Sequence, residues 1–281
     1  MGKFSGVLLA SDFDNTLTDS MGALRAGVDI PPLAPRNREA LEYFTAEGGL
    51  FSVATGRALP AIAPYLPQLP VNAPCVVGNG AGIYDFAQQR YLVTAFLAET
   101  AKPHLQEVMD AFPTLGIELY LQDSRTCALR VNDYIRAHFH LTRAAYVEVD
   151  GLDEVEFPIS KALFEAERPL LDEVVAFLDS RSWKTACEYC FSADHLLELT
   201  APGATKGGMV LRLADLLGVK RENIYCAGDH GNDLSMLAVA AEGFAPANAI
   251  DAVRSSGATL VCAAAEGAMA EIIALLDQRY R

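Results

Sequence analysis

Two apolar stretches of the sequence end in pairs of aspartates that could do chemistry. "GVLLASDFD" ends in Asp12 and Asp14, with one residue between them, and "NIYCAGDHGND" ends in Asp229 and Asp233. Four carboxylates with no histidine or cysteine ligand from the same strands make an oxygen-rich site. Such a site favours Mg²⁺, which is held by a few carboxylates, water and substrate oxygens. The pattern predicts a metal site, although a solvated turn or the metal-binding Asp-x-Asp of a glycosyltransferase stays open at this point.

Groups that bind phosphate follow the other apolar stretches. "LFSVATGR" ends in Thr55, Gly56 and Arg57, and "CVVGNGAGIYD" breaks just before Asn79, while "TKGG" places Lys206 at the start of a helix. A hydroxyl, backbone N–H groups at sharp turns and an ammonium at a helix start all bind anions. Together with a metal and a carboxylate pair, they indicate phosphoryl transfer.

The elements that carry these groups alternate between strand and helix. Residues 36–49 and 206–218 have apolar side chains at helical spacing, whereas the stretches that end in polar groups are continuously apolar. Continuous apolar strands are typical of a parallel sheet that is covered on both faces. Ligands bind outside the carboxyl ends of such strands, so groups far apart in the sequence should converge on one crevice. Solvated loops explain one polar strand end, but they explain four poorly.

The middle of the chain has a different pattern. Residues 84–200 mix partly alternating strands such as "YVEVDG" with helices such as "RPLLDEVVAFLDS", which indicates an α+β unit. Gly82 and Gly203 are the expected hinges. We predict an α/β core built from residues 1–83 and 201–281, with residues 84–200 inserted as a second domain.

Composition excludes several classes of function. The 281 residues are 51% hydrophobic, and no apolar run approaches the roughly 18 residues that a membrane helix needs. The net charge of −14 disfavours nucleic acid and membranes as partners, so an anionic substrate would need local cations. The six cysteines indicate reduced thiols. We expect a soluble, cytoplasmic protein that is a monomer or a homodimer.

The motifs, taken in order, resemble the haloacid dehalogenase-like (HAD) hydrolase superfamily. "DFDNT", "TGR", the lysine of "TKGG" and "GDHGND" carry the resemblance, and "NGAGIYD" and "LELTAPGATKGG" on either side of the insert are similar to the Cof-type branch. The resemblance implies an α/β fold: a Rossmann-like parallel-sheet core with an inserted α+β cap of type IIB. It also implies a Mg²⁺-dependent phosphatase for a small phosphorylated metabolite, such as a sugar phosphate. Asn15 stands where the family often has glycine, and asparagine tolerates a positive φ.

The resemblance further implies roles for individual residues. Asp12 would be the nucleophile that forms an aspartyl-phosphate, and Asp14 would act as acid toward the leaving group and then as base toward water. Mg²⁺ would be held by the carboxylates of Asp12 and Asp229 and by the backbone carbonyl of Asp14, while Asp233 and Asn232 would hold the metal's waters and the loop in place. Thr55 and Lys206 would complete the catalytic set. The groups expected to bind phosphate or substrate are Phe13, Thr16, Gly56, Arg57, Asn79 and Asn232.

Several alternatives remain. A phosphotransferase or phosphomutase would share the aspartyl-phosphate, whereas a phosphate-binding regulator of the same fold should lack a catalytic group, and none is missing. Thr16 could also cap a helix, Arg57 could reach substrate or only tie down the loop, and Asn79 could contact substrate or cap a turn. His230 either belongs to a solvated loop or has a role in substrate contact or in pH dependence.

Overall fold

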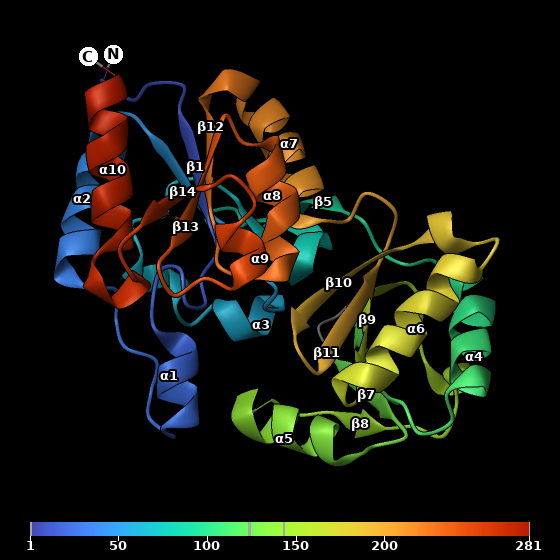
Figure 1. Ribbon diagram of the computed structural model, residues 1–281. Coiled ribbons are helices and arrows are strands. Elements are labelled where there is room, and N and C mark those ends of the chain that lie inside the picture. Colours follow the sequence, from blue (N-terminus) through green and yellow to red (C-terminus); the bar gives the residue numbers. More distant parts are fainter. Residues whose placement is uncertain (1, 123–124, 143, 281) are drawn as a thin grey trace.

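A computed structural model describes residues 2–122, 125–142 and 144–280. Figure 1 shows a core formed by both ends of the chain and a cap formed by its middle. The core sheet has the strand order β14-β13-β12-β1-β2, and all neighbouring strands run parallel. Its strands are β1 (Leu8–Ser11), β2 (Leu50–Val53), β12 (Ile224–Ala227), β13 (Glu242–Pro246) and β14 (Thr259–Val261).

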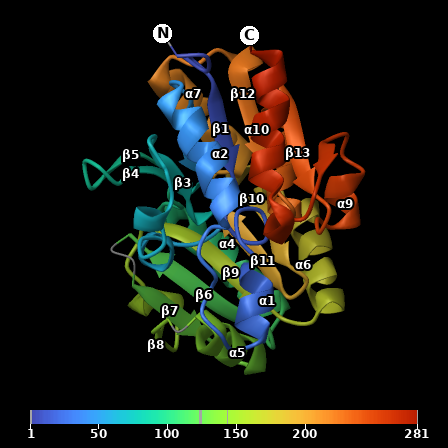
Figure 2. The same ribbon diagram turned by 90° about the vertical axis from the view of Figure 1, so that its left-hand side faces the viewer.

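Helices cover both faces of this sheet, with α2 and α10 on one side and α7 and α8 on the other (Figures 1 and 2). Leu9 of β1 packs with the first pair of helices, whereas Leu8 and Ala10 pack with the second. Burial on both faces explains why the strand is continuously apolar. The core helices are α1 (Ser20–Arg25), α2 (Pro35–Ala46), α3 (Leu59–Ile62), α7 (Lys206–Leu217), α8 (Leu234–Val239), α9 (Asp251–Arg254) and α10 (Ala268–Arg279).

The two predicted core helices form close to the expected bounds. Pro35 occupies the first turn of α2, where its missing N–H costs nothing, and Gly48 adopts a φ of +87° just after the helix ends. In α7, the Thr205 side chain accepts a hydrogen bond from Gly208 N, and Gly218 ends the helix at a φ of +67°. These caps place the first residue of α7, Lys206, at the edge of the sheet.

One core strand is not predicted from the sequence. β13 (Glu242–Pro246) lies between β12 and β14, although glycine and proline in this segment are poor strand formers. Phe244 and Ala245 are fully buried, one toward each face of the sheet. Tertiary packing therefore overrides the weak local preference.

A short antiparallel sheet follows the core strands. It has the order β3-β4-β5, with β3 (Cys75–Val77), β4 (Gly82–Asp85) and β5 (Arg90–Thr94). A parallel bridge between Ala54 and Val76 joins β3 to the end of β2. The expected domain boundary at residue 84 lies within β4, and the division into residues 1–83, 84–200 and 201–281 stays a prediction.

The cap is a six-stranded sheet with the order β10-β11-β9-β6-β7-β8. Its strands are β6 (Gly116–Leu121), β7 (Thr126–Leu129), β8 (Val147–Glu148), β9 (Ile159–Glu165), β10 (Glu188–Ala193) and β11 (Leu196–Thr200). Helices α4 (Lys102–Ala111) and α6 (Arg168–Ser180) bury an apolar core against one face. Helix α5 (Asp133–Thr142) packs on the other face through Ala128, Ile135 and Phe139. The mixed, largely antiparallel sheet confirms the expected α+β character of the insert.

Within the part of the chain that the structure describes, we find no helix with the length and apolarity needed to cross a membrane.

Candidate active site

The carboxyl ends of the core strands meet at one edge of the sheet, as predicted. Asp12 follows β1, and its N–H donates to the carbonyl of Ala227 at the end of β12. Thr55 follows β2, and its N–H donates to the carbonyl of Val76 in β3. These bonds continue the parallel pairing beyond the ends of β1 and β2. They hold Asp12 and Thr55 at the point where the chain leaves the sheet.

An ion-pair cluster lies directly beyond this edge. The Lys206 ammonium donates to Asp12 Oδ1 and to Asp233 Oδ1, each at 2.6 Å. All three side chains are buried. Asp229 lies next to them, and its Oδ1 accepts a hydrogen bond of 2.8 Å from the Thr16 hydroxyl. The structure therefore brings together residues that are more than 190 positions apart in the sequence.

Burial and charge shift the pKa values of this cluster. Burial raises the pKa of Asp12, and the charges of Asp233 and Asp229 add to it, while Lys206 opposes it. Burial also raises the pKa of Asp229 to about 7, with a further contribution from the charge of Asp233. Burial alone would lower the pKa of Lys206, but the two carboxylates it contacts outweigh that effect and raise it. Only one ammonium lies among these three buried carboxyl groups, so the raised pKa values reflect the cost of ionising all of them, and a bound cation would offset that cost.

Asp233 organises the loop that carries Asp229. Its Oδ1 is engaged by Lys206, and its Oδ2 accepts hydrogen bonds from the backbone N–H groups of Asp229 and His230. Oxygen atoms of Asp12, Asp229 and Asp233 lie within 4.8 Å of one another. Because both oxygens of Asp233 are already engaged, Asp12 and Asp229 are the better placed of the three to contact a metal directly. His230 is half-buried, and its role stays a prediction.

Asp14 has a different partner from Asp12. The Arg57 guanidinium forms a two-pronged ion pair with its carboxylate, with Nε 2.8 Å from one oxygen and a terminal nitrogen 2.6 Å from the other. The same guanidinium lies over the rings of Phe13 and Tyr65. Of the two interpretations of Arg57, this contact supports the one in which it holds a neighbouring loop. The Phe13 side chain is buried in the core, so any contact with phosphate would come from its backbone.

The loop after β2 packs against the turn after β3. Thr55 Oγ1 accepts a hydrogen bond from Arg57 N, and a side chain at Gly56 would come within 2.9 Å of Asn79 Nδ2. Asn79 adopts a φ of +55°, and its Oδ1 accepts a hydrogen bond of 2.9 Å from Asn232 Nδ2. The predicted phosphate-binding and substrate-binding residues are therefore neighbours, while their roles remain predictions.

Two residues at this site were missed by sequence analysis because they lie in the cap. The Lys161 ammonium on β9 donates to the Gly56 carbonyl at 3.2 Å and to Glu198 Oε2 on β11 at 2.8 Å. Both side chains are almost fully buried. A signal was present, because "ISKALFE" places a lysine at an inner position of a strand that is mostly buried.

Comparison with known proteins identifies the family of this chain. The model of the haloacid dehalogenase-like hydrolase family matches residues 9–273. The chain is 24% identical to the 5-amino-6-(5-phospho-D-ribitylamino)uracil phosphatase YwtE of Bacillus subtilis (strain 168), over 97% of this chain and 99% of the relative. It is also 24% identical to the pyridoxal phosphate phosphatase YbhA of Escherichia coli (strain K12), over 88% of this chain and 90% of the relative.

Solved structures share the whole architecture. A haloacid dehalogenase-like hydrolase from Bacteroides thetaiotaomicron superposes with a TM-score of 0.77 and 25% identity, covering 96% of this chain and 99% of the other. A sugar phosphatase of HAD subclass IIB superposes with a TM-score of 0.80 and 19% identity, again covering 96% and 99%. The predicted fold class, a parallel-sheet core with an inserted cap of the IIB kind, is confirmed. The chain belongs to the haloacid dehalogenase-like hydrolase family, within which it is a Cof-type phosphatase.

Proposed function

We propose that this phosphatase hydrolyses the phosphomonoester of a small metabolite, with Mg²⁺ as cofactor and Asp12 as nucleophile. The observation that carries the proposal is the buried ion pair between Asp12 and Lys206 at the carboxyl edge of the sheet, with Asp229 beside it. Lys206 holds one oxygen of Asp12 in place and would neutralise charge on a phosphoryl group brought against it. A cytoplasmic location is part of the same proposal.

The donor set fits a hard divalent cation. Asp12 and Asp229 would hold it through carboxylate oxygens, Asp14 through its backbone carbonyl, and Asp233 through water, since the oxygens of Asp233 are engaged elsewhere. The raised pKa values of Asp12 and Asp229 support this assignment, because a cation would stabilise their ionised forms. Such an ion would supply electrostatic stabilisation to the phosphate oxygens.

The side chains of this protein divide the proposed reaction into two displacements. In the first, an Asp12 oxygen forms a bond to phosphorus while the bond to the leaving oxygen breaks, and Asp14 gives that oxygen a proton. In the second, water attacks phosphorus, Asp14 takes its proton and the bond to Asp12 breaks. Thr55 and the Gly56 N–H would bind the phosphoryl oxygens throughout.

The closed cap supports a small substrate with polar groups. β10 of the cap lies against the loop of residues 231–233, where a side chain at Gly231 would come within 3.3 Å of the Phe191 carbonyl. Among the described residues, the buried Asn232 Oδ1 has no hydrogen-bond partner. A hydroxyl group of a sugar phosphate would satisfy it. The two curated relatives are named for small phosphorylated metabolites, which is consistent with this substrate class.

Replacing the nucleophile tests the mechanism. We expect Asp12→Asn to lower kcat for p-nitrophenyl phosphate by far more than about 100-fold, because an amide oxygen cannot form the aspartyl-phosphate. Circular dichroism should show an unchanged fold. Asp215→Asn, which alters an exposed aspartate on α7, serves as the matched control and should keep full activity. More than about a hundredth of wild-type activity in Asp12→Asn would rule out this nucleophile.

Removal of metal tests the cofactor separately. EDTA should abolish hydrolysis, and added Mg²⁺ should restore it, because the carboxylate cluster would then repel an anionic substrate without compensation. Phosphate release is the measurement. Full activity in chelator-treated, metal-free buffer would contradict the metal site.

A further inference from the structure

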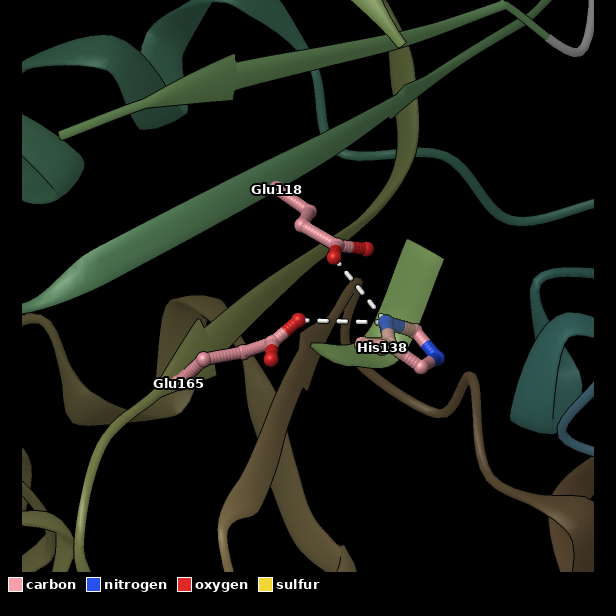
Figure 3. A group of neighbouring side chains, drawn as sticks. All are labelled: Glu118, His138 and Glu165. Atoms are coloured by element: carbon pink, nitrogen blue, oxygen red, sulfur yellow. Dashed lines mark hydrogen bonds and ion pairs between the residues drawn. The ribbon is translucent and has the colours of Figure 1, made fainter. Parts of the chain in front are cut away.

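A second group of possible metal ligands lies in the cap (Figure 3). Glu118 on β6 and Glu165 on β9 direct their carboxylates toward His138 of α5. His138 Nδ1 lies 2.9 Å from Glu118 Oε1 and 3.1 Å from Glu165 Oε1. One ligand atom from each of the three residues lies within 4.8 Å of the other two. This cluster belongs to the sheet face that is opposite α4 and α6.

The strand register and a tight turn build the cluster. Glu165 pairs with Gly116 across β6 and β9, so Glu118, two residues further along β6, lies diagonally across from it on the same face. A side chain at Gly116 would come within 2.6 Å of Asn132 Nδ2. Asn132 donates to the Glu165 carbonyl and accepts from Ile135 N, which fixes the start of α5 beside the two glutamates.

The protein atoms alone leave this cluster unsatisfied. Glu118 and Glu165 are both 0% exposed, and both approach the same His138 nitrogen, which carries at most one hydrogen. Tyr120 donates to Glu118 Oε2 at 2.7 Å, so Glu118 has a second partner. Glu165 Oε2 is fully buried and has no hydrogen-bond partner among the described residues. A buried carboxylate oxygen without a partner is costly, and a cation bound between the two carboxyl groups would offset that cost.

We propose that the cap binds a divalent transition-metal ion of the Zn²⁺ class through Glu118, Glu165 and His138 Nδ1. Imidazole nitrogen and carboxylate oxygen are ordinary ligands of Zn²⁺, whereas the all-oxygen cluster of the core suits Mg²⁺. The Tyr120 hydroxyl orients the Glu118 carboxylate, as outer partners of metal ligands do. His138 is 16% exposed in its side chain, so one side of the cluster is open to an incoming ion.

The ion would fasten α5 to the cap sheet on the face that meets the core. Tyr120 links the cluster to that face, because its ring lies 4.7 Å from the ammonium of Lys161, which contacts the Gly56 carbonyl. The role is positional, and it does not depend on the reaction proposed for the core. Without a metal, a protonated His138 would lie between Glu118 and Glu165, and burial raises the pKa of Glu165, whose carboxyl group would then share a proton with Glu118.

Zinc stoichiometry distinguishes the metal site from this ion pair. Full-length protein carrying Asp229→Asn, which removes a core ligand, would be stripped with chelator, dialysed against Zn²⁺ and analysed by inductively coupled plasma mass spectrometry. We expect one zinc per chain in this background. Added Glu165→Gln or His138→Gln should bring it to near zero, whereas added His140→Gln, an exposed histidine of the same helix, should retain it.

Thermal unfolding provides a second test, because Zn²⁺ would raise the Tm if the three residues bind it and would not raise it if they form only an ion pair. Zn²⁺ should raise the Tm of the Asp229→Asn protein and of its His140→Gln derivative, but not of the His138→Gln derivative. If Glu165→Gln fails to fold, His138→Gln decides alone, because its partly exposed side chain tolerates replacement. The proposal would be overturned if the His138→Gln and His140→Gln derivatives had the same zinc content, whether that is one zinc per chain or none.

Discussion

Asp12 and Asp14 have different surroundings although only Phe13 separates them. Asp12 is 6% exposed and contacts Lys206, whereas the Asp14 side chain is 27% exposed and contacts Arg57. A buried carboxylate held by an ammonium suits attack on phosphorus. A half-exposed carboxylate suits proton exchange with a leaving group and with water. Environment therefore supports different proposed roles for two chemically identical side chains.

At the residue scale, Arg57 offers a prediction. Arg57→Met should lower kcat by about 10- to 100-fold with little change in KM, because the charged hydrogen bonds that hold Asp14, worth about 1.5–3 kcal/mol, are lost. Arg57→Lys keeps the charge but loses the two-pronged geometry, so its kcat should fall between those of the Met variant and the wild type. Steady-state kinetics give both constants. A rise in KM with unchanged kcat would instead show that Arg57 binds substrate.

At the scale of elements, the site depends on the close approach of two segments. The turn of residues 78–80 packs against the first residues of α7, so that Asn79 and Lys206 come from adjoining backbones. Gly80 adopts a φ of +103°, and a side chain there would come within 2.5 Å of the Thr205 carbonyl group. Backbone conformation and space both require glycine at this position.

Gly80→Ala should therefore move the start of α7 and lower both stability and kcat. Gly218→Ala, at the other end of the same helix, is the matched control, because its φ is +67° but no atom lies within 4 Å of the added carbon. The control should lose about 1–2 kcal/mol of unfolding free energy and keep its kcat. Urea denaturation and phosphate release are the measurements. Equal losses of stability and full activity in both variants would contradict the packing argument.

At the scale of the whole molecule, buried polar contacts hold the cap on the core. The ion pair between Lys161 and Glu198 lies within the cap, and Lys161 also donates a hydrogen bond to the Gly56 carbonyl of the core. Burial alone would raise the pKa of Glu198, but the ammonium of Lys161 outweighs it and leaves that pKa below its ordinary value. The pair therefore stabilises the folded protein fully at pH values above the pKa of glutamate in the unfolded chain. This stabilisation is lost as the pH falls through the lower pKa that Glu198 has in the folded protein.

Lys161→Met should destabilise the protein by about 3–5 kcal/mol at pH 7, because Glu198 would remain buried without a cation. The loss should shrink toward about pH 4, where the unpaired Glu198 becomes protonated. Lys161→Met combined with Glu198→Met removes both charges and should recover most of the stability. Urea denaturation between these pH values measures the cycle. A loss that does not change with pH would contradict the ion-pair argument.

The sequence by itself predicted a parallel-sheet core, apart from β13, and the polar residues that follow its strands. Asp12, Thr55 and Asp229 could be placed together because parallel strands share their carboxyl edge, whatever the length of chain between them. Local backbone preference was also readable, since Asn15 adopts a φ of +56°, within the region that asparagine tolerates. These features follow from periodicity, strand direction and residue type, each of which can be inferred from a short stretch of sequence.

Only the tertiary structure decided which side chains meet. The pairing of Arg57 with Asp14, the reach of Lys161 to Gly56 and the position of β13 were not readable from local pattern. The same holds for Glu118, Glu165 and His138 in the cap, whose meeting depends on the register of β6 with β9 and on the docking of α5. A shift of one residue in register moves a side chain to the opposite face of a sheet. Contacts of this kind are therefore set by the packing of whole elements rather than by spacing along the chain.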